Sequence, residues 1–173
     1  MEIYQATPEE YQKIRAFYHS LIDALEGLEY HPMWQKDIYP APEDLQKAIG
    51  EGWLYYGIEK GRIAAAMVLN RNCNPEYSKA DWQIDAGPEE ILVIHMLGVH
   101  RDFTGSGFGK ELVRYALGFA EKTGAKAVRL DVLKGNIPAE KLYEGIGFKH
   151  ITTIPLFYED TGWTDFKLYE YVI

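Results

Sequence analysis

The chain has few of the features that mark membrane or secreted proteins. Its 173 residues contain one cysteine, Cys73, so it forms no internal disulfide, as is usual in a reducing compartment. It has no run of about 18 apolar residues, which a membrane-spanning helix needs. Its first residues also lack the basic and then apolar pattern of a signal peptide. We therefore expect a cytoplasmic protein with no membrane partner.

Positive charge is also in short supply. The chain has 18 Lys and Arg residues against 26 Asp and Glu residues, which gives a formal net charge of −8 at pH 7. A protein that wraps nucleic acid needs many Lys and Arg residues to neutralise phosphates. The charge balance therefore argues against a nucleic-acid partner, and it is compatible with a cationic acceptor such as an amine.

The chain does have a predicted strand that runs through a glycine-rich loop into a helix. Apolar residues 91–99 predict the strand, the loop has glycines at 105, 107 and 109, and apolar residues at helical spacing follow. Glycine allows positive φ angles and lets a ligand come close. The first N–H groups of a helix have no internal partner, and the helix dipole favours an anion there. This stretch therefore predicts a phosphate-binding site.

Two familiar phosphate loops do not fit this stretch. A P-loop, G-x-x-x-x-G-K-[ST], would require glycine at Thr104 and serine or threonine at Glu111. The dinucleotide fingerprint, G-x-G-x-x-G, would require a third glycine at Lys110. The loop therefore has to be interpreted together with the segment that follows it.

A second motif follows the strand predicted over residues 127–132. It has an asparagine, a short helix with a tyrosine and a closing Gly-Phe pair, here Asn136, Tyr143 and Gly147-Phe148. Together with Thr104-x-x-Gly107-x-Gly109, it resembles the two central signatures of the GNAT superfamily of N-acetyltransferases. The resemblance is densest over residues 91–150, and the predicted elements on both sides extend it to the whole chain.

The residue pattern predicts one mixed α/β domain over residues 1–173. We expect strands at 1–6, 53–58, 63–69, 91–99, 127–132, 149–158 and 166–172, and helices at 8–25, 42–49, after the glycine loop and around Tyr143. This order matches what the resemblance implies. Both indicate a GNAT-like fold, with a central, mixed, largely antiparallel twisted sheet of about six to seven strands and helices on both faces.

The resemblance implies acetyl-CoA as co-substrate and no metal. In the family, loop and helix amides hold the pyrophosphate, and the strand before the loop pairs with the pantetheine arm. The implied cofactor-binding residues are Leu97, Gly98, Val99, Thr104, Gly105, Ser106, Gly107, Phe108, Gly109, Lys110, Asn136 and Tyr143. Gly98 suits the opening of the strand, because glycine within a strand often marks a bulge or a close approach.

Two residues are the leading candidates for proton transfer, and Tyr158, Glu159 and Asp160 at the last hairpin are further candidates for the base. Tyr143 matches the family's general acid for the departing thiolate, and a thiol pKa of about 8.5 and a phenol pKa of about 10 make that transfer nearly balanced. His95 is the candidate base, because histidine titrates near neutral pH and alternation places it on one face with Val93, Leu97 and Val99. In the alternative interpretation, Tyr143 only packs its helix and His95 is a hydrogen-bonded core residue.

The resemblance also directs attention to an acceptor pocket between the loop at 26–41 and the last hairpin. This pocket would draw on Tyr30, His31, Trp34, Tyr39, Tyr158 and Trp163, with Tyr30, Trp34 and Tyr158 as the substrate-binding candidates. Aromatic walls bind a cation or stack on a flat acceptor. The alternative is a secondary hydrophobic cluster under long loops.

Two functions follow from these observations. The first is an enzyme, an acyltransferase that moves acetyl from acetyl-CoA to an amine of a small molecule or peptide by direct attack. The second is a CoA-binding sensor with the same fold and little or no turnover. Thr104 leaves room for the second, because the family usually has Arg or Gln there and a threonine hydroxyl makes only a short neutral contact. The acceptor's identity is open, and a homodimer is among the open oligomeric states.

Overall fold

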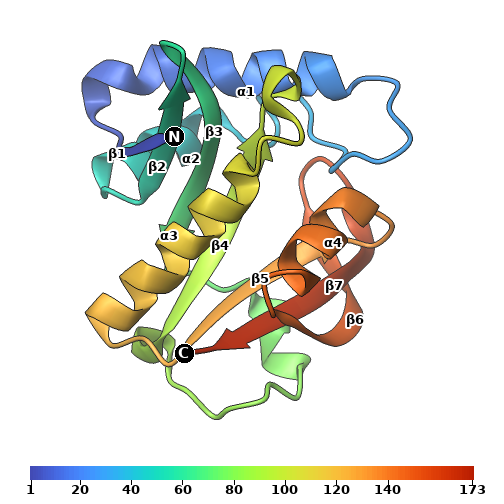
Figure 1. The fold of residues 1–173 in the computed structure, drawn as a ribbon. Coiled ribbons are helices and arrows are strands. Elements are labelled where there is room, and N and C mark those ends of the chain that lie inside the picture. The colour runs from blue at the N-terminus through green and yellow to red at the C-terminus, as the bar shows by residue number, and fades with distance from the viewer.

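The computed structural model describes residues 1–173 (Figure 1). The strands are β1 (Glu2–Gln5), β2 (Leu54–Glu59), β3 (Arg62–Asn70), β4 (Ile91–Val99), β5 (Ala127–Leu133), β6 (Lys149–Tyr158) and β7 (Gly162–Val172). The helices are α1 (Tyr11–Leu25), α2 (Pro42–Gly50), α3 (Phe108–Thr123) and α4 (Ile137–Glu144). Short 3-10 segments lie at Pro8–Glu10, Pro75–Lys79, Pro88–Glu90 and Arg101–Phe103.

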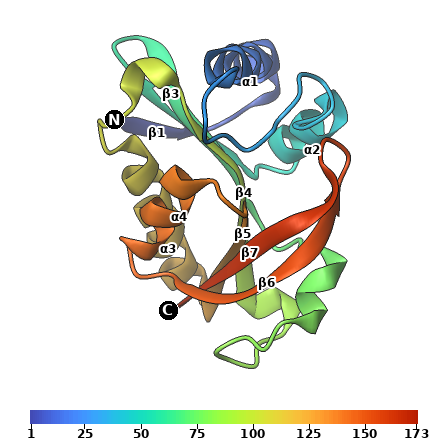
Figure 2. The same cartoon turned by 90° about the vertical axis from the view of Figure 1, so that its right-hand side faces the viewer.

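All the strands belong to a single seven-stranded sheet in the order β1-β2-β3-β4-β5-β7-β6. Neighbouring strands are antiparallel except β4 and β5, which are parallel. Helices α1 and α2 cover one face of this sheet, and α3 and α4 cover the other (Figure 2). The mixed, largely antiparallel sheet with helices on both faces that the sequence predicts is confirmed.

Three groups of buried apolar side chains hold these layers together. The largest lies between the sheet and α3 and includes Leu112, Val113 and Ala116, none of them accessible to solvent. The second packs α1 and α2 against the sheet, and the third lies beneath the 3-10 segment Pro75–Lys79. Burial of each leucine or valine stabilises the fold by about 1.5–3 kcal/mol.

Strands β4 and β5 diverge after a short stretch of pairing. Only Ile91–Val93 of β4 pair with Ala127–Arg129 of β5, and the rest of β5 pairs with β7 alone. Figure 1 shows the two strands close together at one end and spread apart at the other. The spread leaves the second half of β4 without a neighbour on its β5 side, which opens the sheet between them.

A bulge in β4 changes which side chains share a face. Between the pairs Ala66–Gly98 and Val68–His95, β3 has one residue and β4 has two, and Met96 takes a positive φ of 53°. Leu97 therefore packs with the α3 core, whereas strict alternation from His95 would give it the opposite orientation. The prediction that His95 shares a face with Leu97 and Val99 was wrong for this reason.

Two element boundaries differ from the sequence prediction by more than one residue. Strand β7 begins at Gly162 rather than at residue 166, because Trp163 and Thr164 pair with Phe157 and Leu156 of β6. The first turn of the N-terminal helix is a 3-10 segment, and the Thr7 N–H donates to the Glu10 carboxylate at 2.9 Å. Neither difference changes the order of the elements.

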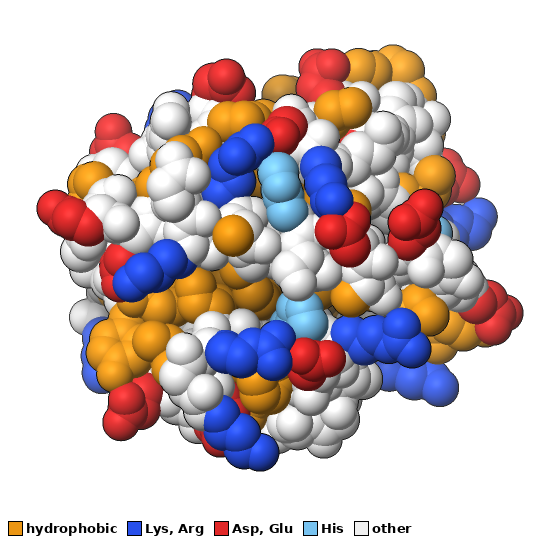
Figure 3. All heavy atoms as spheres, turned by 90° about the horizontal axis from the view of Figure 1, so that it is seen from above, with side chains coloured by type: hydrophobic (Ala, Val, Ile, Leu, Met, Phe, Trp, Pro, Cys, Tyr) orange, Lys and Arg blue, Asp and Glu red, His pale blue; other side chains and the backbone are white.

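The face above α1 carries charges of both signs. Basic and acidic side chains lie interspersed on it (Figure 3). Arg15 pairs with Asp37 at 2.7 Å, and Lys36 pairs with Asp23. No helix of the chain is long and apolar enough to cross a membrane.

Candidate active site

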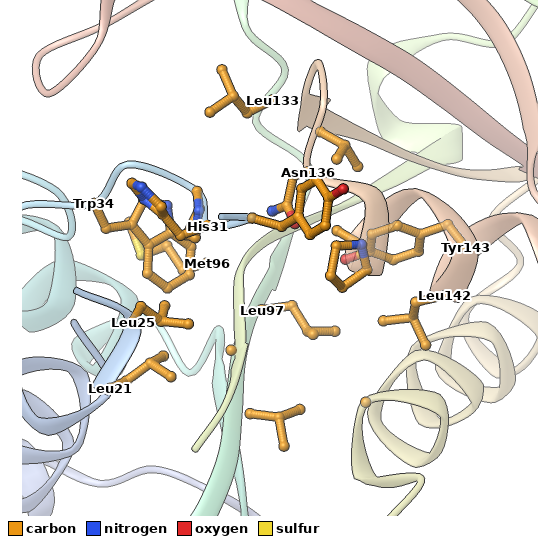
Figure 4. Close-up of a pocket in the computed structure, with 18 of the residues that line it drawn as sticks. Leu21, Leu25, His31, Trp34, Met96, Leu97, Leu133, Asn136, Leu142 and Tyr143 are labelled. Carbon is orange, nitrogen blue, oxygen red and sulfur yellow. The ribbon is translucent and has the colours of Figure 1, made fainter. Parts of the chain in front are cut away.

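A cavity of about 700 Å³ opens where β4 and β5 diverge. Its floor is the second half of β4, and its walls come from α1 with the loop after it on one side and from α4 on the other. In Figure 4, His31, Trp34 and Met96 lie on one side and Leu142 and Tyr143 on the other, with Asn136 between them. The cavity also borders the start of α3 and the last hairpin.

The start of α3 presents backbone N–H groups to one end of this cavity. Gly105 and Gly107 take positive φ angles of 81° and 82°, which only glycine adopts without strain. The N–H groups without a hydrogen bond in the protein are those of Gly105, Gly107, Phe108, Gly109 and Lys110. Glu111 is the first whose N–H is bonded within the helix, to Gly107 at 3.1 Å. A set of converging free amides at a helix start is suited to a phosphate group.

The other predicted loop residues divide into two groups. Thr104 is exposed and lines the cavity, as do Gly105, Gly107, Phe108, Gly109 and Lys110. Ser106 does not line it, and its N–H donates to the Phe103 carbonyl at 3.2 Å. Gly109 also lets α3 and α4 approach closely, because a Cβ there would lie 3.2 Å from Leu142 Cδ2.

Leu97, Gly98 and Val99 all line the cavity, and of the two features expected at Gly98 the structure shows a close approach and not the bulge. A Cβ on Gly98 would lie 2.4 Å from Leu21 Cδ2 and 3.4 Å from the Trp34 ring. The glycine therefore makes room for α1. The irregular backbone of the strand occurs at Met96, whose carbonyl accepts a hydrogen bond from the Tyr18 hydroxyl at 2.8 Å.

Asn136 and Tyr143 face the cavity from α4. Asn136 stands at the N-cap of α4, but its side chain makes no capping hydrogen bond and has no partner in the protein. The Tyr143 ring is buried against Phe148 and Tyr169, at centroid distances of 5.5 and 6.4 Å. Its hydroxyl has no hydrogen-bond partner and is not sealed from solvent. Burial, and then the charge of Asp131, raise the pKa of this phenol, so it keeps its proton at neutral pH.

His95 is half-buried and lines the cavity. Its Nε2 is 3.1 Å from Asn70 Oδ1 and 3.0 Å from the Asn72 carbonyl. Asn70 Oδ1 also accepts the Asn72 N–H, so both neighbours of Nε2 are acceptors, which assigns the proton to Nε2 and leaves Nδ1 unprotonated. Burial lowers the pKa of His95, so its neutral form is favoured.

Asp131 on β5 is a site residue that the sequence interpretation missed. Its Oδ2 accepts hydrogen bonds from the hydroxyls of Tyr77 at 2.6 Å and Tyr158 at 2.8 Å. Burial raises the pKa of Asp131, and the two phenols and His95 oppose that shift. The signal in the sequence was a pair of charged residues, Arg129 and Asp131, at alternate positions of the predicted strand.

The aromatic candidates gather at the end of the cavity away from α3. Tyr30, His31, Trp34, Tyr39 and Tyr158 all line it. The Trp34 and Tyr39 rings are 6.1 Å apart, and the Tyr39 and Tyr158 rings are 5.5 Å apart. Trp163 is 65% exposed and packs on Phe157 outside the cavity. Its inclusion was wrong, because alternation along β7 turns it to the outer face.

Comparison with known proteins identifies the family of this chain. The model of the acetyltransferase (GNAT) family matches residues 14–148. The chain belongs to this family. The resemblance seen in the sequence is therefore confirmed, and the match includes both the glycine loop of the GNAT signature and the segment with Asn136 and Tyr143.

Individual relatives are more distant. A mycothiol acetyltransferase of Geodermatophilus obscurus is 36% identical over 106 residues, which are 61% of this chain and 33% of that protein. A GNAT acetyltransferase from Streptococcus agalactiae has the same fold, with a TM-score of 0.81, 19% identity and coverage of 99% of this chain and 95% of its own. The chain spans 33% to 58% of the length of the curated relatives that it matches.

One solved structure of the same fold contains its cofactor acetyl-CoA. This is the Salmonella typhimurium protein yncA, with a TM-score of 0.68, 16% identity and coverage of 99% of this chain and 93% of its own. At such identity the likeness shows the fold alone.

Proposed function

We propose that this protein is an acetyl-CoA-dependent N-acetyltransferase that transfers acetyl to an amine by direct attack in a ternary complex. One observation carries the proposal. A single cavity joins the free amides at the start of α3, the free hydroxyl of Tyr143 and an end lined by aromatic and acidic side chains. Donor, proton donor and acceptor would therefore meet in one space, as direct transfer requires.

The residues present suit the donor. The amides of Gly105 and of Gly107–Lys110 would hold the pyrophosphate, and Lys110 and Lys141 add positive charge near the same end of the cavity. Asn136 offers a free side-chain amide for the polar groups of the pantetheine arm. The unpaired edge of β4 at Leu97–Val99 offers backbone groups for the same purpose. When bound, acetyl-CoA supplies an activated acetyl group as a thioester.

Tyr143 would act as the general acid. Its hydroxyl reaches the cavity and makes no other hydrogen bond, so it is available to donate a proton to the leaving thiolate. Burial raises the pKa of the phenol, so the hydroxyl keeps its proton at neutral pH, and proton transfer to the thiolate is less balanced than the sequence predicted. General acid catalysis of this kind contributes about 10²- to 10⁴-fold to a rate.

His95 would accept the proton that the ammonium must lose before its nitrogen attacks. The ring is held by the Asn70 side chain and the Asn72 carbonyl, and Nδ1 is its unprotonated nitrogen. The lowered pKa keeps His95 neutral and ready to accept a proton at neutral pH. No enzyme nucleophile is required, and Cys73 does not line the cavity.

Titration with acetyl-CoA, followed by thiol release with a panel of amines, tests this function. We expect the wild-type protein to bind acetyl-CoA by calorimetry and to release free thiol only when an amine is added. No binding at millimolar acetyl-CoA would contradict the proposal. A burst of thiol release without an amine, with a trapped acetyl-enzyme, would contradict direct attack.

A second function, that of a CoA-binding sensor, follows from Thr104, because the family usually has Arg or Gln at this position. A sensor would bind acetyl-CoA and release no thiol with any amine. The choice between a small molecule and a peptide as acceptor, the cytoplasmic location and a homodimer remain predictions.

A further inference from the structure

We propose that Asp131 is the acceptor-recognition residue, and that it selects a compact cationic amine. This inference rests on the proposed function and names the substrate class of the same cavity. Asp131 lies two residues beyond Arg129, the last residue of β5 that pairs with β4. At Asp131 the edge of β5 that faces β4 is therefore unpaired and borders the opening between the two strands. The residue lines the cavity there.

The two oxygens of Asp131 have different surroundings. Oδ2 accepts both tyrosine hydroxyls, from Tyr77 and Tyr158, which fixes the direction of the carboxylate. Oδ1 accepts no hydrogen bond from the protein and is not sealed from solvent. No Lys or Arg side chain pairs with Asp131, since it takes part in none of the ion pairs of the chain. A carboxylate that is oriented, unpaired and open to a cavity is suited to bind a cation.

The rest of this end of the cavity favours the same ligand. The Tyr39 and Tyr158 rings lie 5.5 Å apart beside Asp131, and aromatic faces attract an ammonium group. Asp160, in the turn between β6 and β7, also lines this end, and its Oδ1 is buried without a hydrogen-bond partner. The two lysines of the lining, Lys110 and Lys141, both belong to the α3–α4 end. The cavity is therefore cationic where the donor phosphates would lie and anionic where the acceptor would lie.

The size of the acceptor is limited by the loop between α1 and α2. This loop reaches across to the last hairpin, where the Gln35 side chain donates to the Asp160 carbonyl at 2.9 Å. On its other side, Arg15 and His19 hold Asp37 of the loop at 2.7 and 2.9 Å. The loop is thus tied to both α1 and the hairpin. The inference therefore takes a compact amine as the acceptor, because a folded protein chain would have to displace these contacts.

Binding of matched ligands to the wild-type protein tests the inference without any substitution. The probes are benzylamine against benzyl alcohol, and 1,4-diaminobutane against 1,4-butanediol, measured by calorimetry with CoA present at neutral pH. In each pair the shape is similar and only the amine carries charge. We expect the amine to bind at least 10-fold more tightly in one or both pairs, because a hydrogen bond between an ammonium group and a carboxylate is stronger than one between neutral groups. Amines that bind no more tightly than the alcohols in either pair would overturn the inference.

The variant Asp131→Asn then identifies the residue responsible. It keeps an acceptor for the two tyrosines and removes the charge, so we expect the preference for the amine to fall about 10- to 100-fold while the affinity for acetyl-CoA stays unchanged. A merely structural role would weaken amine and alcohol alike and leave their ratio as it was, which would overturn the assignment. Asp165→Asn is the matched control, because Asp165 is 50% exposed and pairs with Lys134 outside the cavity.

Acetyl-CoA binding and thiol release by the wild-type protein test the proposed function separately from the amine measurements. If the wild-type protein fails to bind acetyl-CoA or to release thiol, the acetyltransferase proposal fails, whatever the amine measurements show. If it releases thiol with amines but binds amines and alcohols equally, only the assignment of Asp131 fails.

Discussion

The two ends of the cavity are built in different ways. At the α3 end, the groups that face a ligand are backbone amides of neighbouring residues, Gly105 and Gly107–Lys110. At the other end they are side chains from segments far apart in the sequence, such as Trp34, Asp131 and Tyr158. Backbone groups are the same in every sequence, so the first end suits a donor that many proteins share. Side chains differ between sequences, so under our proposal the second end would determine which acceptor is bound.

The largest effect is expected where the two ends meet, at Tyr143. The variant Tyr143→Phe removes the proton donor and keeps the buried ring, so we expect kcat to fall about 10²- to 10⁴-fold with little change in acetyl-CoA affinity. Steady-state kinetics and calorimetry measure the two quantities. Tyr115→Phe on the outer side of α3 is the control, because Tyr115 packs on Tyr55 outside the cavity. An unchanged kcat in Tyr143→Phe would remove the general-acid role.

The next effect concerns pH and His95. Burial lowers the pKa of His95 below its usual value of about 6.5, so the imidazole becomes neutral at a lower pH than a free histidine does. If His95 accepts the proton, kcat should stay level above that value and fall only as the pH drops through the lowered pKa. His95→Gln should reduce kcat by about 100-fold and abolish the acid limb. A pH profile that is the same in both proteins would exclude His95 as the base.

Gly107→Ala tests the end built from backbone. Its positive φ of 82° makes alanine unfavourable by about 1–2 kcal/mol. We therefore expect the free backbone amides of the loop to be displaced and acetyl-CoA to bind several-fold more weakly. The preference for amine over alcohol should not change. Gly118→Ala in the same helix is the control, because a Cβ there meets nothing within 4 Å, and it should stabilise the fold slightly. Equal acetyl-CoA affinity in both variants would contradict the binding of the pyrophosphate by these amides.

The smallest effect is expected at Thr104. The variant Thr104→Arg introduces the residue type that is usual in this family, at an exposed position on the rim of the cavity. We expect acetyl-CoA to bind about 3- to 10-fold more tightly, because a charge-assisted contact to a phosphate is added, though weakened by solvent. Calorimetry at two salt concentrations measures the gain. A gain that does not shrink at high salt would show that the added contact is not ionic.

The fold was largely predictable from the sequence, and the reasons are local. Hydrophobic periodicity, turn residues and the glycine loop are properties of short segments, and these gave the correct order of strands and helices and the two helical layers. The face of His95 and the role of Gly98 were not predictable. The face of His95 depends on the extra residue of β4 at Met96 in its pairing with β3. The role of Gly98 depends on how closely Leu21 of α1 approaches this glycine.

The sequence by itself therefore determined the helices and strands, the family and the end of the cavity where Gly105 and Gly107–Lys110 present free amides. All three depend on residues that lie close together along the chain. The tertiary structure alone decided the end that includes Asp131. Its partners Tyr77 and Tyr158 are 54 and 27 residues away, and the divergence of β4 from β5 is what opens Asp131 to the cavity. In the sequence, Asp131 is one of two charged residues that alternate with apolar residues in a strand, and only the folded chain places two distant tyrosines against it.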